Sequence, residues 1–370
     1  MKNITYIFSQ NRKKNYNDKQ NYAKDFYYGI YSFENKNNNI EIIEFSENKS
    51  LLHPLLNFFD KFLNKFLSLP SYTSKLTNLK NLKKILKTDD LFLVNEGVGF
   101  SSILILFVAR FFKRINVSLF AMGLYSKNLK FKKLKSLHLF FIKLLVLSVN
   151  NIIFLGNAEF EKAKNIHKKQ IEKFNFLPFC IDTEFWKNKN NKDLTKNENI
   201  IFVGNDGNRD FELLIKLAES LKQFNFIIVS SNEVFKNLDL PNVKIHNGSW
   251  GSGEISDADL RNLYLESRLS IIPLKESLQP SGQSVALQSM SLGIPVMITE
   301  TKGFWQKDIF LDEENIFFVN DFDYKNWVNK INKVFNDDLQ IKKISKNAKS
   351  TVLENYKLEV LYKFINQICS

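Results

Sequence analysis

The stretch RLSIIPLKESLQPSGQSVALQSMSLGIPVMIT, residues 268–299, holds the pattern that decides the fold. A β-rich apolar run at 268–274 leads into a polar loop, a helix-length pattern follows, and a second apolar run begins at Pro295. Strand runs that alternate with helix-length segments predict parallel strands joined by crossover helices. The stretch is therefore one strand, loop, helix and strand of an α/β fold.

Similar apolar runs recur along the chain in two series. The first series lies at 4–9, 40–45, 90–96, 116–122 and 151–156, and the second at 200–205, 224–231, 242–248, 268–274, 295–301 and 315–321. Between them lies an Asn- and Lys-rich segment whose composition predicts an exposed linker. We expect an α/β protein with two doubly wound Rossmann-like domains that face each other across a cleft. The predicted parts are a first domain at 1–185, a linker at 186–198, a second domain at 199–350, and a final helix at 351–370 that can pack back on the first domain.

Length and composition narrow the class of protein. The 370 residues are 44% hydrophobic, which is enough for two buried cores. The two cysteines, Cys180 and Cys369, support neither a disulfide framework nor a four-cysteine zinc site and fit a reducing compartment. The first apolar run is too short for a signal peptide, and no later run reaches the ~20 residues of a membrane-spanning helix. The four histidines lack metal-ligand spacing, so no metal is expected.

Charge is unevenly distributed along the sequence. Residues 1–175 contain 29 basic and 13 acidic residues, a net of +16, whereas the remainder has a net of −3. No acidic residue occurs from Gly97 to Ala158, although nine basic residues do. Such a window predicts an anionic partner. Nucleic acid is disfavoured, because no recognised nucleic-acid-binding motif is present and bulky apolar residues are mixed with the charge.

Lysines join an apolar helix pattern within this window, at 129–149. The cluster consists of Lys130, Lys132, Lys133, Lys135 and Lys143, and a similar mixture occurs at 56–69. This combination is typical of helices that lie on an anionic membrane surface, and we predict a membrane and acceptor face here. The alternative is an ordinary amphipathic helix whose apolar side packs on the sheet. With the membrane interpretation, the protein is cytoplasmic and peripheral on the inner face of the cytoplasmic membrane.

The uncharged turn at 279–284 predicts a phosphate site. Ser281 is a candidate N-cap of the following helix, and Gly282 lets a ligand approach the backbone closely. The first free N–H groups, from Gly282, Gln283 and Ser284, carry the positive end of the helix dipole. A plain capped helix is the alternative.

A second turn, in IIFVGNDGNRD at 200–210, resembles the first in layout. Gly204 and Asn205 follow the strand, and a helix begins near Asp210. Arg209 would lie at the mouth of the domain, where a guanidinium can hold a diphosphate through two hydrogen bonds. It could instead be a surface arginine paired with Asp210. The segment is not a P-loop, and no Gly-x-Gly-x-x-Gly follows the first strand, so a dinucleotide is disfavoured.

These two segments, together with PFCIDTEFW at 178–186, resemble the C-terminal domain of GT-B glycosyltransferases of the retaining family 4, the glycosyl transferases group 1. The similarity covers roughly residues 150–325 by motif and 1–150 by strand order only. The resemblance implies a nucleotide-diphosphate sugar as co-substrate, with its diphosphate on the helix N-terminus at 282–284 and on Arg209. It further implies retention, with the leaving diphosphate helping to deprotonate the acceptor, so that the main task of the protein is to stabilise charge on that leaving group.

The sequence departs from the family pattern at three places. The family has two Glu eight positions apart, where this chain has Pro280 and Gln288. Gln288 can still form hydrogen bonds with a ribose hydroxyl pair. Glu276 or Gln279 could take the role of the first Glu only if the loop here differs in length from that of the family. The His that the family places after the fourth strand is absent, since LFAMGLY at 119–125 has Met122 before Gly123.

Glu96, at the end of the run 90–96, is a further candidate acid facing the cleft, or else an N-cap or loop carboxylate.

The function expected from these features is transfer of a sugar from a nucleotide donor in the second domain to a cell-envelope glycan or a lipid-linked acceptor in the first. Two other classes stay open. One is a GT-B-fold nucleotide-sugar 2-epimerase, which needs acid and base groups around the sugar. The other is a non-catalytic relative that binds a glycan or a partner enzyme, which the missing Glu pair and His would explain.

Overall fold

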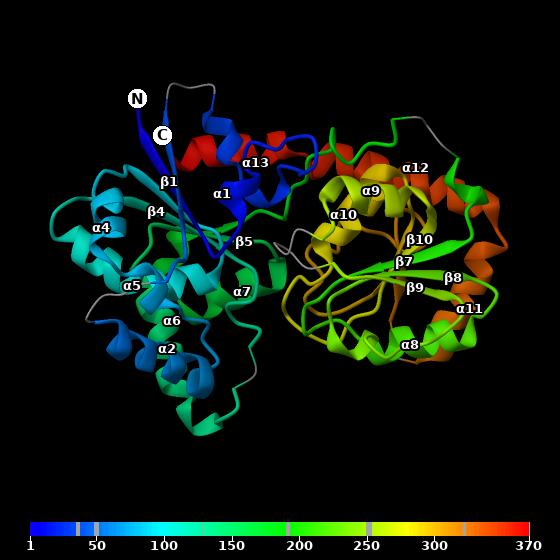
Figure 1. Ribbon diagram of the computed structural model, residues 1–370, viewed down its shortest axis with the longest axis horizontal. Helices are drawn as coiled ribbons and strands as arrows, with labels where there is room; N and C mark the ends of the chain where they lie inside the picture. Colours follow the sequence, from blue (N-terminus) through cyan, green and yellow to red (C-terminus); the bar gives the residue numbers. More distant parts are fainter. Residues whose placement is uncertain are drawn as a thin grey trace. The chain divides into compact units, whose positions relative to one another are not determined.

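The described part of the chain contains two parallel sheets of six strands each (Figure 1). The computed structural model describes residues 1–34, 38–47, 52–127, 129–189, 193–248, 254–320 and 323–369. The chain divides into two compact units: unit 1 is Met1–Asn17, Tyr27–Leu177 and Leu361–Ser370, and unit 2 is Asp18–Phe26 and Pro178–Val360. The predicted α/β class with two doubly wound sheets is confirmed.

Unit 1 has the strand order β2-β1-β3-β4-β5-β6. The strands are β1 (Asn3–Phe8), β2 (Asn39–Glu44), β3 (Asp90–Leu93), β4 (Asn116–Ala121), β5 (Asn151–Phe154) and β6 (Phe174–Phe176). The helices are α1 (Arg12–Asn15), α2 (His53–Leu67), α3 (Thr73–Leu76), α4 (Leu79–Ile85), α5 (Glu96–Arg110), α6 (Lys135–Leu147) and α7 (Asn157–Ile166). Every residue of β3 is buried, as expected for a parallel strand whose sheet is covered on both faces.

Unit 2 has the strand order β12-β11-β10-β7-β8-β9. The strands are β7 (Asn199–Val203), β8 (Asn225–Val229), β9 (Val243–His246), β10 (Ser267–Ile272), β11 (Val296–Thr299) and β12 (Phe317–Val319). The helices are α8 (Phe211–Ser220), α9 (Asp257–Leu265), α10 (Gln283–Leu292), α11 (Tyr324–Phe335) and α12 (Asp338–Asn355), and α13 (Leu358–Ile368) runs from unit 2 into unit 1. Phe202, Leu214, Ile271 and Trp327 belong to the core between sheet and helices.

The boundary between the units lies at other residues than the predicted ones. Residues 178–186 belong to unit 2, because the apolar side chains of PFCIDTEFW are buried there, Trp186 completely. In the predicted linker 186–198, residues 190–192 lie outside the described residues, and Leu194 is buried within a 3₁₀ turn at Leu194–Lys196. At the other end, Leu361–Ser370 join unit 1, where the Ile365 side chain packs directly on Gly29.

Each sheet has a switch point at which the strand order reverses. In unit 2 the chain runs from β7 outward to β9 and then returns to place β10 on the other side of β7. In unit 1 the same reversal puts β1 beside β3. Ligands of open α/β sheets bind at the carboxyl ends of the strands that flank such a point. The loops after β7 and β10, and those after β1 and β3, are therefore the places to look for a site.

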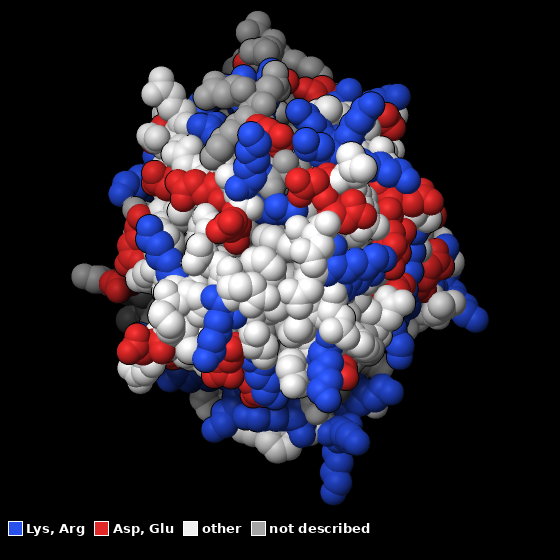
Figure 2. Space-filling view, turned by 90° about the vertical axis from the view of Figure 1, so that its right-hand side faces the viewer, with Lys and Arg blue, Asp and Glu red and all other residues white. Residues whose placement is uncertain are grey.

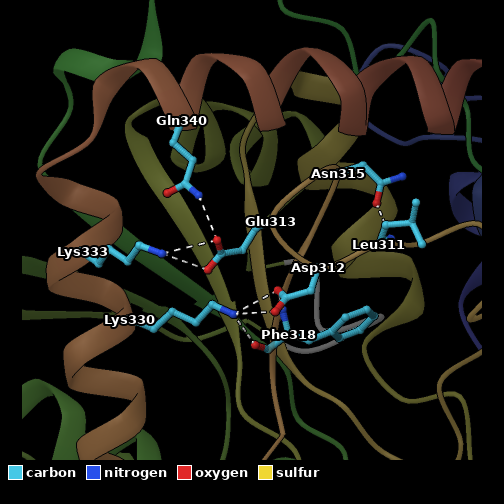
Figure 3. Close-up of polar contacts among 8 residues, drawn as sticks. All are labelled: Leu311, Asp312, Glu313, Asn315, Phe318, Lys330, Lys333 and Gln340. Carbon is cyan, nitrogen blue, oxygen red and sulfur yellow. Dashed lines mark hydrogen bonds and ion pairs between the residues drawn. The ribbon is translucent and has the colours of Figure 1, made fainter.

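The long connection from β11 to β12 supports the loop after β10. Lys330 of α11 binds Asp312 at 2.9 Å and the carbonyl of Phe318 at 2.7 Å, and Lys333 binds Glu313 at 3.1 Å (Figure 3). At its other end, Gly303 lies against the backbone of Leu278 and Gln279, so closely that an added Cβ would be 2.5 Å from the Leu278 carbonyl carbon. Ion pairs from α11 thus hold a connection that packs against the loop at 273–282.

Candidate functional site

The two turns singled out in the sequence form one structure at the carboxyl edge of the unit 2 sheet. The Asp210 N–H donates to the carbonyl of Pro273 at 3.0 Å, and the Lys275 N–H donates to that of Asn208 at 2.8 Å. The Asn208 amide nitrogen also donates to Gln279 Oε1 at 3.0 Å and to Ser281 Oγ at 2.8 Å. Asn208, which lies beside Arg209 in the motif but was not predicted as a site residue, therefore ties the loops together.

Arg209 lies between these loops with its guanidinium packed against two glycines. A Cβ added to Gly204 would overlap its Nε, and a Cβ added to Gly282 would lie 2.9 Å from its Nη1. The Nε is 3.1 Å from a carboxylate oxygen of Asp206, while Asp210 instead caps α8 by accepting the Leu213 N–H. Only 3% of Arg209 is exposed, and its Nη1 has no hydrogen-bond partner among the described residues.

An unpaired buried guanidinium nitrogen costs free energy unless an acceptor arrives. Arg209 is the residue that such an acceptor would meet, and a nearby helix N-terminus adds partial positive charge. The arrangement is suited to a bound anion with at least two oxygens.

Helix α10 begins at Gln283, one residue later than a Ser281 cap would allow. Its N-cap is Gly282 in the left-handed conformation (φ +81°), and no side chain caps the helix. The prediction that Ser281 is the cap is wrong, because the Ser281 hydroxyl accepts the Asn208 amide instead. Gln283 and Ser284 lie in the first turn, whose N–H groups have no partner within the helix. The uncharged turn therefore brings the helix N-terminus next to Arg209.

Gln288 is engaged elsewhere. It is buried in the middle of α10, about 9 Å along the helix from Gly282, and its Nε2 donates to Asp25 Oδ2 at 2.9 Å. Asp25 also accepts the Trp186 indole N–H at 2.7 Å and the Asp182 backbone N–H at 2.6 Å. Burial raises the pKa of Asp25 to about 7, although these donors oppose the shift. No local signal could have revealed Asp25, since 263 residues separate it from Gln288.

Three other predicted residues of unit 2 have different positions. Glu276 is exposed and accepts the Lys302 N–H at 3.1 Å. Gln279 belongs to the joined loops through its contact with Asn208. Asn205 fastens neighbouring strand ends, because its side chain accepts the Ser231 N–H and donates to the carbonyl of Gly248, each at 2.6 Å.

Glu96 in unit 1 is the first residue of α5, beside the switch point of that sheet. It is buried, and its Oε2 has no partner among the described residues. Glu159 in α7, which was not predicted, is also buried and accepts the Tyr125 N–H at 2.9 Å, while its Oε2 is likewise unpaired among those residues. Burial and the charge of Glu96 raise the pKa of Glu159 to about 8, although the Tyr125 N–H and the charges of Lys162 and Lys127 oppose the shift. Glu96 and Glu159 are therefore two buried carboxyl groups of unit 1 that lie close enough for the charge of Glu96 to act on Glu159.

The predicted lysine face surrounds the start of α6. Lys130, Lys132, Lys133, Lys135 and Lys143 are all exposed. Aromatic rings connect this region to α2, because Phe131 stacks on Phe66 at 5.7 Å between centroids and Phe141 contacts Phe59 at 5.9 Å. Leu55 and Phe58 of α2 are exposed beside them in sequence. On the face that unit 2 presents in Figure 2, by contrast, both signs of charge are interspersed.

Within the described ranges of the chain, no group of three His, Cys, Asp or Glu side chains could hold a metal ion. No helix in the described part of the chain is both long and apolar enough to cross a membrane.

Comparisons with known proteins give the site a context. Residues 182–351 match the family Glycosyl transferases group 1. Similar solved structures include HepE from Anabaena in complex with UDP and glucose (12% identity, TM-score 0.67, 99% of each chain covered). They also include sucrose-phosphate synthase from Thermosynechococcus elongatus (12% identity, TM-score 0.68, 100% of this chain and 98% of that one). A glycosyltransferase from Rickettsia africae is similar as well (13% identity, TM-score 0.64, 100% and 97% covered).

Among curated protein sequences, none matches this chain significantly. The structural matches extend over the whole chain and at these identities show its fold, whereas the family match covers the segment that contains Arg209, α10 and the joined loops. The fold that the resemblance implied is thereby confirmed: the chain has the GT-B fold of these solved structures, and residues 182–351 match the family Glycosyl transferases group 1.

Proposed function

We propose that the protein transfers a sugar from a nucleotide-diphosphate donor to a hydroxyl acceptor with retention of configuration. One observation carries this proposal: the buried guanidinium of Arg209, with Nη1 unpaired among the described residues, lies against the N-cap glycine of α10. Bound UDP in the HepE structures makes UDP-sugars the first donors to test.

Charge stabilisation is the chemistry that this arrangement suits. As the bond from the sugar to the diphosphate breaks, negative charge grows on the leaving oxygen, and Arg209 and the α10 N-terminus would stabilise it. The acceptor oxygen bonds to the sugar on the same face, and its proton passes to the leaving phosphate oxygen. This route requires no metal and no separate base.

The remaining site assignments belong to the same proposal. Donor contacts are assigned to Gly204, Asn205, Gln279, Ser281, Gly282, Gln283, Ser284 and Gln288. Catalytic roles beside Arg209 are assigned to Glu276 and Glu96. For Gln288 this role requires its carboxamide to leave Asp25, because the nitrogen that would donate to a ribose oxygen now donates to that residue.

The acceptor is proposed to be a cell-envelope glycan or a lipid-linked sugar, reached by a protein that lies on the inner face of the cytoplasmic membrane. The exposed lysines around α6 and the exposed apolar side chains of α2 support this, because cationic and aromatic side chains together favour an anionic bilayer surface.

Calorimetry with UDP tests the donor site. Arg209→Ala should bind UDP about 100-fold more weakly than wild type, a loss of about 2.7 kcal/mol. Arg261→Ala is the matched control, because Arg261 stacks on Phe185 in the same unit and contacts none of the joined loops in the described structure. Equal affinity of wild type and Arg209→Ala would refute the proposed role.

Product analysis tests the reaction. NMR of the product should show the anomeric configuration of the donor, and EDTA should leave the rate unchanged. Glu96→Gln and Glu276→Gln should lower kcat if these residues take part. Conversion of the nucleotide sugar without any acceptor would instead favour an epimerase, and UDP binding without transfer across a donor panel would favour a non-catalytic relative.

Vesicle flotation tests the membrane face. Lys→Gln at positions 130, 132, 133 and 135 should weaken binding to anionic vesicles by about 1 kcal/mol per lysine at low salt. Lys→Gln at positions 342, 343, 346 and 349 of α12 removes the same charge from unit 2 and should have no effect. Equal losses in both variants would mean that only net charge matters.

A further inference from the structure

A groove crosses the amino-terminal edge of the unit 1 sheet at the C-terminal end of α6, whereas four lysines of the lysine face, at positions 130, 132, 133 and 135, lie at or before the start of that helix. The last turns of α5 and α6 flank a cavity of about 330 Å³ lined mainly by Ile103, Phe107, Phe111, Leu144 and Leu147. This edge is also opposite to the one that carries Glu96, since α5 begins at Glu96 and ends at Arg110. The groove is thus separate from the sites proposed above.

The apolar cavity continues into a basic one. The second cavity, of about 300 Å³, is lined by Arg110, Arg114 and Lys173 together with Leu147 and Asn150. Arg110 and Leu147 line both cavities, so they are adjacent parts of one groove. One end is therefore hydrocarbon-like and the other is cationic.

The three cations lack carboxylate partners. In the described part of the chain, no carboxylate lies within ion-pairing distance of Arg110, Arg114 or Lys173, whereas Lys113 beside them pairs with Asp89 at 2.7 Å. Arg110 Nη2 donates to the side-chain amide oxygen (Oδ1) of Asn150 at 3.2 Å. Lys173 donates to the carbonyls of Val146 at 3.3 Å and Val149 at 2.8 Å. Burial lowers the pKa of Lys173 and the nearby Arg110 charge lowers it further, whereas the Glu172 charge opposes this shift. Cations that repel each other in a partly buried place would gain from a bound anion.

The apolar end of the groove leaves two large aromatic side chains in contact with water. Phe107 is 63% exposed and Phe111 is 74% exposed, with their rings in edge-to-face contact at 5.0 Å. Large exposed apolar patches that adjoin polar groups mark sites of interaction. A hydrocarbon chain laid between these rings and Leu144 would remove apolar surface from water.

We propose that this groove binds one anionic phospholipid molecule, with its phosphate among Arg110, Arg114 and Lys173 and an acyl chain along Phe107, Phe111, Leu144 and Leu147. Charge complementarity at one end and apolar lining at the other identify an amphiphile, because a free phosphate would leave the apolar cavity empty. The proposal does not depend on the donor site, which lies in unit 2.

Calorimetry on the full chain tests the site with dihexanoyl-phosphatidylglycerol below its micellar concentration. Saturable binding is expected, with at least tenfold weaker binding of dihexanoyl-phosphatidylcholine and no binding of glycerol 3-phosphate. Equal binding of glycerol 3-phosphate would overturn the proposal in favour of a plain phosphate site. Equal binding of the two lipids would overturn the role of the cations.

Two double variants separate the ends of the groove. Arg110→Gln with Arg114→Gln, and Phe107→Ser with Phe111→Ser, should each weaken lipid binding at least tenfold. Both phenylalanines are largely exposed, and Gln can keep a contact with Asn150, so the fold should persist, which unchanged UDP affinity and circular dichroism would check. Lys→Gln at positions 342 and 343 of α12, exposed residues of unit 2, should bind the lipid as wild type does. Wild-type affinity in both groove variants would mean adventitious, detergent-like binding and would refute the site.

Discussion

The two sheets share a topology but have opposite chemistry at their switch points. In unit 2 the loops after β7 and β10 surround an arginine, with glycines and a helix N-terminus close by. In unit 1 the corresponding edge carries Glu96, and Glu159 lies buried near it. The strand order determines where a site can form, and the loop residues determine its charge. An anion suits the first site, whereas unpaired carboxyl oxygens suit hydroxyl groups.

The largest effect is expected from Gly282→Ala, which would break the unit 2 side of this comparison. An added Cβ would lie 2.7 Å from the Ile272 side chain and 2.9 Å from Arg209 Nη1, at a φ of +81°. Strain and overpacking should cost about 2–4 kcal/mol of unfolding free energy, and UDP affinity should fall about 100-fold because Arg209 is displaced. Urea unfolding and calorimetry measure the two quantities.

Gly207→Ala, in the joined loop after β7, provides the control. Nothing lies within 4 Å of a Cβ added there. Stability and UDP affinity should stay at the wild-type values. If both alanine variants lose affinity alike, the packing of glycine against Arg209 is not what matters.

Glu159→Gln tests the unit 1 side of the comparison, through the effect of a buried carboxyl group on the pH dependence of stability. The folded pKa of Glu159 is raised from 4.5 to about 8, so between these values the folded state holds a proton that the unfolded state has released. Wild-type stability should therefore fall as pH rises through this window, and the Gln variant should lack that loss. For each unit that the pH rises in this window, the unfolding free energy of wild type should fall relative to that of Glu159→Gln by up to about 1.4 kcal/mol. Urea unfolding at pH 5, 6.5 and 8 tests this, and parallel pH curves would contradict it.

Asp25→Asn compares a buried acid that accepts three hydrogen bonds with the buried acids of unit 1 that have an unpaired oxygen among the described residues. Three N–H donors surround Asp25, and an amide must turn one of its own N–H groups toward them. The variant should lose about 1–3 kcal/mol at pH 8, where the wild-type carboxyl is mostly ionised. Asp18→Asn changes a partly exposed acid in the same segment, whose carboxylate accepts hydrogen bonds from Asn21 three residues away, and should affect urea unfolding less. If Asp25→Asn leaves the free energy of unfolding unchanged, the hydrogen bonds from the three donors make no net contribution to stability.

The smallest effect is expected from Asn208→Ala. The variant loses the contacts with Gln279 and Ser281 that join the loops, and each such hydrogen bond is worth about 0.5–1.5 kcal/mol. UDP affinity should fall about 3- to 10-fold while Arg209 stays in place. Gln223→Ala, which removes a surface amide contact with Asn332, should leave calorimetric binding unchanged. A loss as large as that of Gly282→Ala would mean that Asn208 contacts the ligand itself.

Local patterns were readable from the sequence, and long-range contacts were not. Eleven of the twelve described strands coincide with predicted apolar runs. Central strands such as β3 and β10 are buried throughout, which favours apolar runs, whereas the edge strands β2 and β9 are buried only in part. Only β6, three residues long, was missed. The Arg209 loop and the start of α10 were found because glycine and polar residues follow strands there.

The errors arise where a partner lies far away in sequence. Ser281 was predicted to cap α10, but its hydroxyl binds Asn208, 73 residues away. Trp186 was placed in a linker, although its indole donates to Asp25, 161 residues away. Glu159 gave no signal, because its burial depends on packing rather than on a motif.

The segment at 18–26 has a consequence for dissecting the protein into fragments. It belongs to unit 2, although it lies between β1 and β2 in sequence, so the chain passes between the units at 17/18, 26/27, 177/178 and 360/361. A fragment that starts at Pro178 would lack Asp25 and would leave the Trp186 indole, the Gln288 amide and the Asp182 N–H without their acceptor. The half that carries Arg209 is therefore complete only with nine residues supplied from the beginning of the polypeptide, in cis or as an added peptide.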